Sequence, residues 1–197
     1  MKTYSAASSD LESHITRMQS EHHSELDGVT VSALFVFDDE SSEPVLKHQG
    51  YPAAAVVSIT PVKQRALGMA DAIVIVDRSA WQTMGARQRD ALIDHELQHL
   101  TRVIAEATEE EPKHPKCDSI GRPKLAMRQH DHQLGWFDDI ARRHGDASCE
   151  VRQAKQLMAS TQQLYFDFGS IPAPNSPKAK AATRARKQRG GTRVGAH

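Results

Sequence analysis

The stretch Ala91-Leu-Ile-Asp-His-Glu-Leu-Gln-His-Leu100 has the pattern of a long amphipathic helix, on which the rest of the fold can be built. Its apolar residues recur at i, i+4, i+7 and i+11, which places the following side chains on one helix face: Ile93, Leu97, Leu100 and Ile104. Thr83 is suited to cap the start of this helix, since its hydroxyl can accept a hydrogen bond from the first turn. We therefore predict a helix from about Met84 to Ala107.

The same stretch contains the motif His95-Glu96-Leu97-Gln98-His99. Histidines at i and i+4 lie on the same face of a helix, with Cβ atoms roughly 6 Å apart, so both imidazoles can chelate one ion. Zinc suits such a pair because it is tetrahedral and accepts nitrogen ligands. Glu96 can take a proton from a water on the ion and act as general base. The motif predicts a metal-dependent hydrolase; the competing interpretation is two ordinary surface or core histidines.

A catalytic zinc usually has a third protein ligand and one open position. The densest group of candidates downstream is His130-Asp131-His132. We rank His132 ahead of His130, because His132 would lie in the first turn of a helix that Trp136 anchors one turn later. The residue of this group that is not a ligand could orient a ligand imidazole or contact substrate. Two more histidines are weaker candidates: His114 and His144.

The rest of the chain alternates strand-like and helix-like segments. Short runs of β-branched and apolar residues predict strands at 29–37, 54–60, 72–76 and 125–128. Apolar residues at helical spacing predict three more helices, which begin near Ser9, Asp131 and Cys149. This mixture predicts an α+β fold, with a short sheet packed on the helix that carries His95.

The C-terminal end differs in composition from the rest of the chain. Residues 171–177 are rich in proline, which blocks the hydrogen bonds of helix and sheet, and residues 178–197 lack the apolar content to fold alone. We therefore predict an N-terminal helix at 1–28, a main domain at 29–168, and a proline-rich linker with a disordered basic tail at 169–197.

The formal net charge is zero, but the charges are unevenly distributed. The last acidic residue is Asp167, and seven basic residues follow it: Lys178, Lys180, Arg184, Arg186, Lys187, Arg189 and Arg193. The first 167 residues therefore carry about −7 and the tail +7. This tail predicts loose, salt-sensitive contact with nucleic-acid phosphates; the competing interpretation is a solubilising tail. Aromatic residues are absent from it, so base stacking is not expected.

The cysteine content and the N-terminus indicate the compartment. Cys117 and Cys149 form neither a C-x-x-C pair nor a disulfide framework, which fits a reducing environment. Residues 1–28 are too polar for a signal peptide, and the apolar stretches are too short for a membrane span. We predict a cytoplasmic protein.

From about Pro44 to Gly145 the chain resembles the putative phage metallopeptidase family, which is found in phages and prophages. The resemblance rests on these residues: Val45-Leu-Lys-His-Gln-Gly-Tyr-Pro52, Arg65-Ala-Leu-Gly68, Ala70-Asp-Ala-Ile-Val-Ile-Val-Asp77, Trp81, Gln88, the stretch from Ala91 to Leu100, His130-Asp131, Phe137 and Arg143-His-Gly145. It covers about half of the chain. It implies a small zincin-like fold, a metal at His95 and His99, Glu96 as the catalytic carboxylate, and a bacterial host cytoplasm as the place of action.

One spacing departs from that family, whose His-Asp pair stands closer to the following aromatic residue. Because two extra residues intervene here, counting back from Phe137 points to His132, whereas matching the His-Asp dipeptide points to His130. The arrangement is also similar to the SprT and Spartan proteases, in which a histidine that opens a helix is followed four residues later by an aromatic. His132 and Trp136 match that spacing, so both histidines stay candidates.

These observations favour a zinc-dependent metallopeptidase that acts on a protein or peptide substrate, with nucleic-acid contact through the tail and no membrane partner. The alternative is a metal-stabilised binding or regulatory protein with little turnover, acting on a host or phage partner or on DNA. Glu96 favours the enzyme, because a closed structural zinc site with four ligands has no use for that carboxylate. A weaker hypothesis is hydrolysis of a non-peptide bond by the same site.

Overall fold

The computed structural model describes residues 1–41, 43–48, 50–107, 112–131 and 136–168, with side chains up to residue 159. The chain divides into two compact units, Met1–Arg152 and Gln153–His197. Of the second unit, the described part continues helix α6 (Cys149–Phe168). The predicted tail at 169–197 lies outside the described residues, so its disorder and its contact with nucleic acid stay predictions, as do the domain boundaries at 28 and 168.

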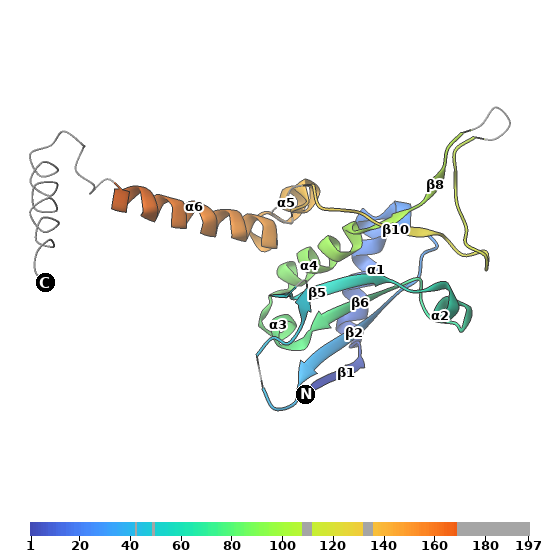
Figure 1. Cartoon of the computed structure of the whole chain (residues 1–197), viewed down its shortest axis with the longest axis horizontal. Helices are drawn as coiled ribbons and strands as arrows, with labels where there is room; N and C mark the ends of the chain where they lie inside the picture. The colour runs from blue at the N-terminus through green and yellow to red at the C-terminus, as the bar shows by residue number, and fades with distance from the viewer. Residues whose placement is uncertain (42, 49, 108–111, 132–135, 169–197) are drawn as a thin grey trace, which may run out of the picture. The chain divides into compact units, whose positions relative to one another are not determined.

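A four-stranded mixed sheet lies at the centre of the first unit (Figure 1). Its strand order is β1-β2-β6-β5, with bounds Lys2–Ala6, Val31–Asp38, Ala72–Asp77 and Ala55–Ile59. β2 and β6 run parallel, whereas β1 and β5 are antiparallel edge strands. The apolar run of β6 suits a central strand because it can be buried on both faces.

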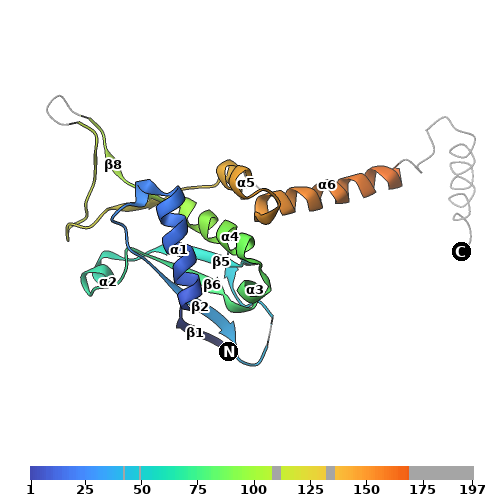
Figure 2. The ribbon, with the colours of Figure 1, turned by 180° about the vertical axis from the view of Figure 1, so that it is seen from behind.

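Two helices pack on this sheet and close the core. Helix α1 (Ser9–His22) is capped by Ser8, whose hydroxyl accepts a hydrogen bond from the N–H of Leu11 at 3.3 Å. Figure 2 shows α1 in front of the sheet. α1 also packs against helix α4 (Ala86–Gln98), so the two helices and the sheet enclose a single apolar cluster. This cluster fixes α4 on the sheet and with it the histidines at the end of α4.

Helix α4 begins later than predicted. Thr83 ends the preceding helix α3 (Arg78–Thr83) and does not cap α4. Instead α4 starts after Gly85, whose N–H donates to the side-chain oxygen of Gln88 at 3.0 Å. The side chain of Gln88 thus accepts a backbone hydrogen bond at the start of the helix. The hydroxyl of Thr83 was expected to have this capping role.

Helix α4 also ends earlier than predicted, at Gln98. The next residues, Leu100–Arg102, form strand β7, because they pair with β10 (Leu125–Met127) in an antiparallel ladder. The prediction that Leu100 and Ile104 share the apolar helix face is therefore wrong. Leu100 is buried from a strand, and Ile104 is 46% exposed.

The remaining short elements lie around this core. Two hairpins are formed by β3 with β4 (Lys47–His48 and Tyr51–Pro52) and by β8 with β9 (Ile104–Ala105 and His114–Pro115). Short helical segments are α2 (Val62–Ala66), η1 (Ser24–Leu26) and η2 (Gly145–Ala147). Among the described residues, the chain contains no helix whose length and apolar content would let it cross a membrane.

Helix α5 spans Asp138–His144 and so begins later than the predicted start near Asp131. Phe137 has an extended backbone and precedes the helix. The carboxylate of Asp131 nevertheless accepts a hydrogen bond from the first residue of the helix, at 3.1 Å from the N–H of Asp138. Phe137 and Ile140 are both 0% exposed, so they hold this segment on the core.

The mixed α+β character predicted from the sequence is confirmed, and the predicted strands within 29–37, 54–60, 72–76 and 125–128 are all present. Strand β1 was not predicted. Its sequence has no apolar alternation, and it becomes a strand by pairing with β2, from Lys2 opposite Asp38 to Ala6 opposite Leu34. Trp81 is 4% exposed and belongs to the apolar core.

Candidate metal centre

His95 and His99 lie at the C-terminal end of α4, where His95 is in the last turn and His99 is the C-cap residue. Their spacing of four residues turns both rings to the same side, and the ring centroids lie 5.2 Å apart. His95 is buried, and His99 is half-buried. The sequence expectation that both imidazoles face one point is consistent with this geometry.

His130 reaches the same point because β10 pairs with β7. This pairing brings Arg128 beside His99, where the N–H of Arg128 donates to the carbonyl of His99 at 2.7 Å. Two residues later, the ring of His130 lies 4.5 Å from His99 and 5.2 Å from His95, measured between centroids. The Nε2 atoms of His95 and His130 are 3.3 Å apart.

The Nδ1 atoms of the two helix histidines face oxygen acceptors. Nδ1 of His95 lies 2.7 Å from a carboxylate oxygen of Glu150, and Nδ1 of His99 lies 2.9 Å from the carbonyl oxygen of Arg128. These acceptors favour the tautomer with the proton on Nδ1, which leaves the Nε2 lone pair of each ring for a ligand. The buried ring of Phe137 packs against all three histidines, with centroid distances of 5.1, 4.8 and 4.8 Å.

This donor set fits a zinc ion. One ligand atom from each of His95, His99 and His130 can be chosen so that all lie within 4.8 Å of one another. Two nitrogens on a tetrahedral zinc are separated by about 3.3 Å, since each Zn–N bond is about 2.0–2.1 Å. The Nε2 atoms of His95 and His130 already have that separation. Three imidazoles also leave one tetrahedral position open, as in catalytic rather than structural zinc sites.

The environment gives the three imidazoles different pKa values. Burial lowers the pKa of His99 to about 4, and burial together with the charge of His95 also lowers the pKa of His130. Burial acts on His95 in the same direction, but hydrogen bonds with Cys149 and Glu150 outweigh it and raise the pKa of His95 to about 10. His99 and His130 are therefore neutral at neutral pH, which is the form that binds a metal, whereas His95 must lose the proton on Nε2 when a metal binds.

Glu96 is buried beside this cluster and is held by the edge strand β5. Its Oε2 accepts a hydrogen bond from the N–H of Val57 at 2.8 Å. Burial raises the pKa of Glu96, although the charge of His95 and the Val57 hydrogen bond oppose the shift. A carboxyl group with a raised pKa is a better proton acceptor near neutral pH than an ordinary carboxylate.

The other candidates from the sequence lie elsewhere or outside the described residues. His132 is outside them. The carboxylate of Asp131 accepts hydrogen bonds from Arg128 at 2.7 Å and from the N–H of Asp138, so it joins the ends of the segment that carries His130. The remaining two histidines are directed away from the cluster: His114 contacts the carbonyl of Pro112, and His144 contacts Asp94.

Sequence analysis did not single out Glu150. It lies in the first turn of α6, is 1% exposed, and also accepts a hydrogen bond from the thiol of Cys149 at 3.3 Å. Glu150, Cys149 and the Nδ1 side of His95 form a second group of possible metal ligands. A local pattern could not identify Glu150, because its partner His95 is 55 residues away in the sequence.

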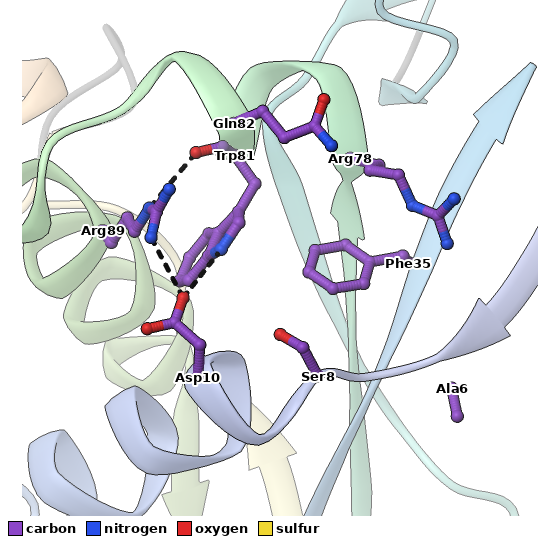
Figure 3. A pocket seen from close by; sticks show the side chains of 8 residues that line it. All are labelled: Ala6, Ser8, Asp10, Phe35, Arg78, Trp81, Gln82 and Arg89. Atoms are coloured by element: carbon purple, nitrogen blue, oxygen red, sulfur yellow. Dashed lines mark hydrogen bonds and ion pairs between the residues drawn. The ribbon is translucent and has the colours of Figure 1, made fainter.

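A separate pocket of about 370 Å³ lies between the starts of α1 and α4, and it does not include the histidine cluster. Figure 3 shows Arg89 paired with Asp10 in this pocket. Arg89 donates to the carboxylate of Asp10 at 3.0 Å and to the carbonyl of Trp81 at 3.2 Å. Arg78 donates to the hydroxyl of Ser5 at 2.6 Å and covers the ring of Phe37. These contacts connect β1, α1 and α3, so the charged residues that line the pocket hold these elements together.

The geometry can be compared with known proteins. Residues 2–165 match the sequence model of the family described as putative phage metallopeptidase. The chain belongs to this family. The match confirms the resemblance and extends it beyond the segment 44–145 to residues 2–165. Searches among curated proteins and solved structures give no match. Membership of a metallopeptidase family implies a metal and a protein or peptide substrate.

Proposed function

We propose that this chain is a zinc-dependent metallopeptidase, encoded by a phage or prophage, in which His95, His99 and His130 hold the ion. The observation that carries the proposal is the convergence of three imidazoles, each with one ring nitrogen within 4.8 Å of those of the other two, while Nδ1 of His95 and Nδ1 of His99 contact oxygen acceptors. His132 stays a second candidate for the third ligand.

A zinc ion held at this position supplies Lewis-acid polarisation of a substrate carbonyl and lowers the pKa of water. Glu96 is the residue we propose as general base. It takes the proton from the attacking water and then passes that proton to the leaving amine, so that the peptide bond is cleaved without net change at Glu96. The hydrogen bond from Val57 fixes one carboxylate oxygen, which leaves the other for this proton transfer.

The first test measures metal content and proteolysis together in wild type and in Glu96→Gln. We expect about one zinc per chain in both proteins, because Glu96 is not among the proposed ligands. Cleavage of a dye-labelled unfolded protein should fall by roughly 100- to 10,000-fold in Glu96→Gln, the usual contribution of a general base. Zinc retention with undiminished cleavage would contradict the role of Glu96. Zinc binding without any cleavage by wild type would favour a binding or regulatory protein.

The same measurement on His130→Ala and His132→Ala identifies the third ligand. We expect His130→Ala to lose the ion and His132→Ala to retain it, because the Nε2 atom of His130 already lies 3.3 Å from that of His95. The reverse result would assign the third ligand to His132 and leave the rest of the proposed site unchanged.

A further inference from the structure

The contact between His95 and Glu150 joins two buried groups from distant parts of the chain. Glu150 is 1% exposed and the side chain of His95 is 11% exposed, so their hydrogen bond at 2.7 Å is largely shielded from water. A buried carboxylate is costly unless it is paired and hydrogen-bonded. Here the imidazole of His95 and the thiol of Cys149 supply those partners, at one carboxylate oxygen each.

This hydrogen bond determines which nitrogen of His95 can bind a metal. With Nδ1–H donated to Glu150, the lone pair of the neutral form of His95 is on Nε2, on the side where Nε2 of His130 lies 3.3 Å away. A carboxylate acceptor fixes the orientation of the ring and raises the basicity of the nitrogen opposite. His99 differs, because its Nδ1 meets only the neutral carbonyl of Arg128. Of the two histidines of the motif, His95 is therefore the one whose Nδ1 meets a carboxylate.

We propose that Glu150 is a positioning residue, which holds the ring of His95 so that Nε2 faces the metal. This inference rests on the proposed zinc site and identifies a residue that acts on it from the start of α6. A competing arrangement uses the same groups differently, with an ion bound by Nδ1 of His95, Cys149 and Glu150. That arrangement would break the hydrogen bond between His95 and Glu150, and it makes Cys149 a ligand.

The test compares Glu150→Gln with a matched control, Glu25→Gln. Both substitutions neutralise a carboxylate that contacts Nδ1 of a histidine, but Glu25 contacts His23 at 3.1 Å, outside the zinc site. Zinc affinity is measured by competition with a chromophoric chelator. We expect Glu150→Gln to bind zinc about 10- to 100-fold more weakly than wild type, the usual effect of losing such a partner. Glu25→Gln should stay within about two-fold of wild type.

The absorption spectrum of cobalt bound in place of zinc is a second measurement. It would not change if Glu150 only stabilised the fold. In Glu150→Gln we expect a tetrahedral cobalt spectrum whose ligand-field bands are shifted from those of wild type, because the basicity of His95 has changed. Wild type and Cys149→Ser should give the same spectrum, without a thiolate-to-cobalt band. A thiolate band in wild type that Cys149→Ser removes would overturn the inference in favour of the competing arrangement.

The outcomes separate this inference from the proposed function. Wild-type zinc affinity and an unshifted cobalt spectrum in Glu150→Gln would overturn the positioning role and leave the zinc site intact. A wild-type protein that takes up no zinc would overturn the proposed function, and this inference with it. Circular dichroism of the zinc-free variants checks that Glu150→Gln is folded. Glu150→Asp should recover part of the zinc affinity, because it restores the negative charge on a side chain that is one methylene shorter.

Discussion

Two neighbouring residues of α4, Asp94 and His95, each lie at the centre of a histidine cluster. The two clusters differ in which ring nitrogen contacts a carboxylate. At Asp94 a buried carboxylate is surrounded by donors: Nε2 of His23 at 2.7 Å, Nε2 of His144 at 2.6 Å and Arg143 at 3.2 Å. At His95 the arrangement is inverted, because Nδ1 meets a carboxylate while Nε2 faces other imidazoles. Proximity of histidines is common to both clusters, so proximity alone does not indicate a metal site.

The difference lies in which nitrogen is engaged by oxygen. Around Asp94 the Nε2 atoms donate to the carboxylate, and hydrogen bonds from both histidines and the charge of Arg143 hold its pKa low despite burial. The cluster is a set of hydrogen bonds from the two histidines and an ion pair with Arg143, and it ties α5 and the residue that follows α1 to α4. In His95 and His99 the Nδ1 atoms contact oxygen acceptors, and Nε2 of His95 faces Nε2 of His130. We infer that the first cluster stabilises the fold and the second binds the ion.

The largest expected effect is on metal binding. If this effect is absent, the two clusters do not differ in role as we infer. His99→Ala should lose the zinc that wild type retains through gel filtration, because it removes a proposed ligand. His144→Ala should keep about one zinc per chain, since Nε2 of His144 is directed to Asp94. Atomic emission of both variants measures the difference. Equal loss of zinc in the two variants would mean that the clusters do not have separate roles.

The next effect is on the free energy of unfolding. Asp94 is 0% exposed, so Asp94→Ala leaves His23 and Arg143 without their buried counter-charge and should cost about 3–5 kcal/mol. Glu25→Ala removes the other carboxylate from His23, but Glu25 is 53% exposed, and its loss should cost under about 1 kcal/mol. Urea unfolding of the zinc-free proteins measures both values. Similar costs for the two variants would contradict a special role for the buried carboxylate.

The smallest effect separates two adjacent arginines of α5. Arg143 contacts Asp94 and donates to the side-chain oxygen of Gln98 at 3.2 Å, so Arg143→Ala should cost roughly 1–3 kcal/mol of stability. Arg142 pairs with Asp139 on the surface and is 75% exposed, so Arg142→Ala should change stability by under about 0.5 kcal/mol. Thermal unfolding of the pair measures this contrast. A larger loss in Arg142→Ala would show that the Asp94 cluster does not hold α5.

The sequence predicted what depends on local spacing and missed what depends on pairing across the chain. His95, Glu96 and His99 could be proposed because one helical turn relates them. The end of α4 could not, because Leu100–Arg102 forms a strand only through its pairing with β10. Strand β1 was missed for the same reason, since its weakly apolar residues depend on β2.

The choice between His130 and His132 as third ligand also could not be made from local spacing. Counting residues along the chain left both as candidates, because the spacing to Phe137 differs from that of the family. The structure brings His130 to the cluster through the β7–β10 ladder, which no local pattern describes. Glu150 was even less predictable from the sequence, since nothing near it distinguishes it from other acidic residues at helix starts.

The distance along the chain between His95 and its partners has a consequence for biosynthesis. His130 and Glu150 follow His95 by 35 and 55 residues, so a ribosome completes α4 well before it delivers either. At about 5–20 residues per second, the nascent chain spends several seconds with its helix made and its site unassembled. The proposed metal centre can therefore form only after His130, 35 residues beyond His95, has been synthesised. The proposed hydrolytic activity would begin no earlier than that point in translation.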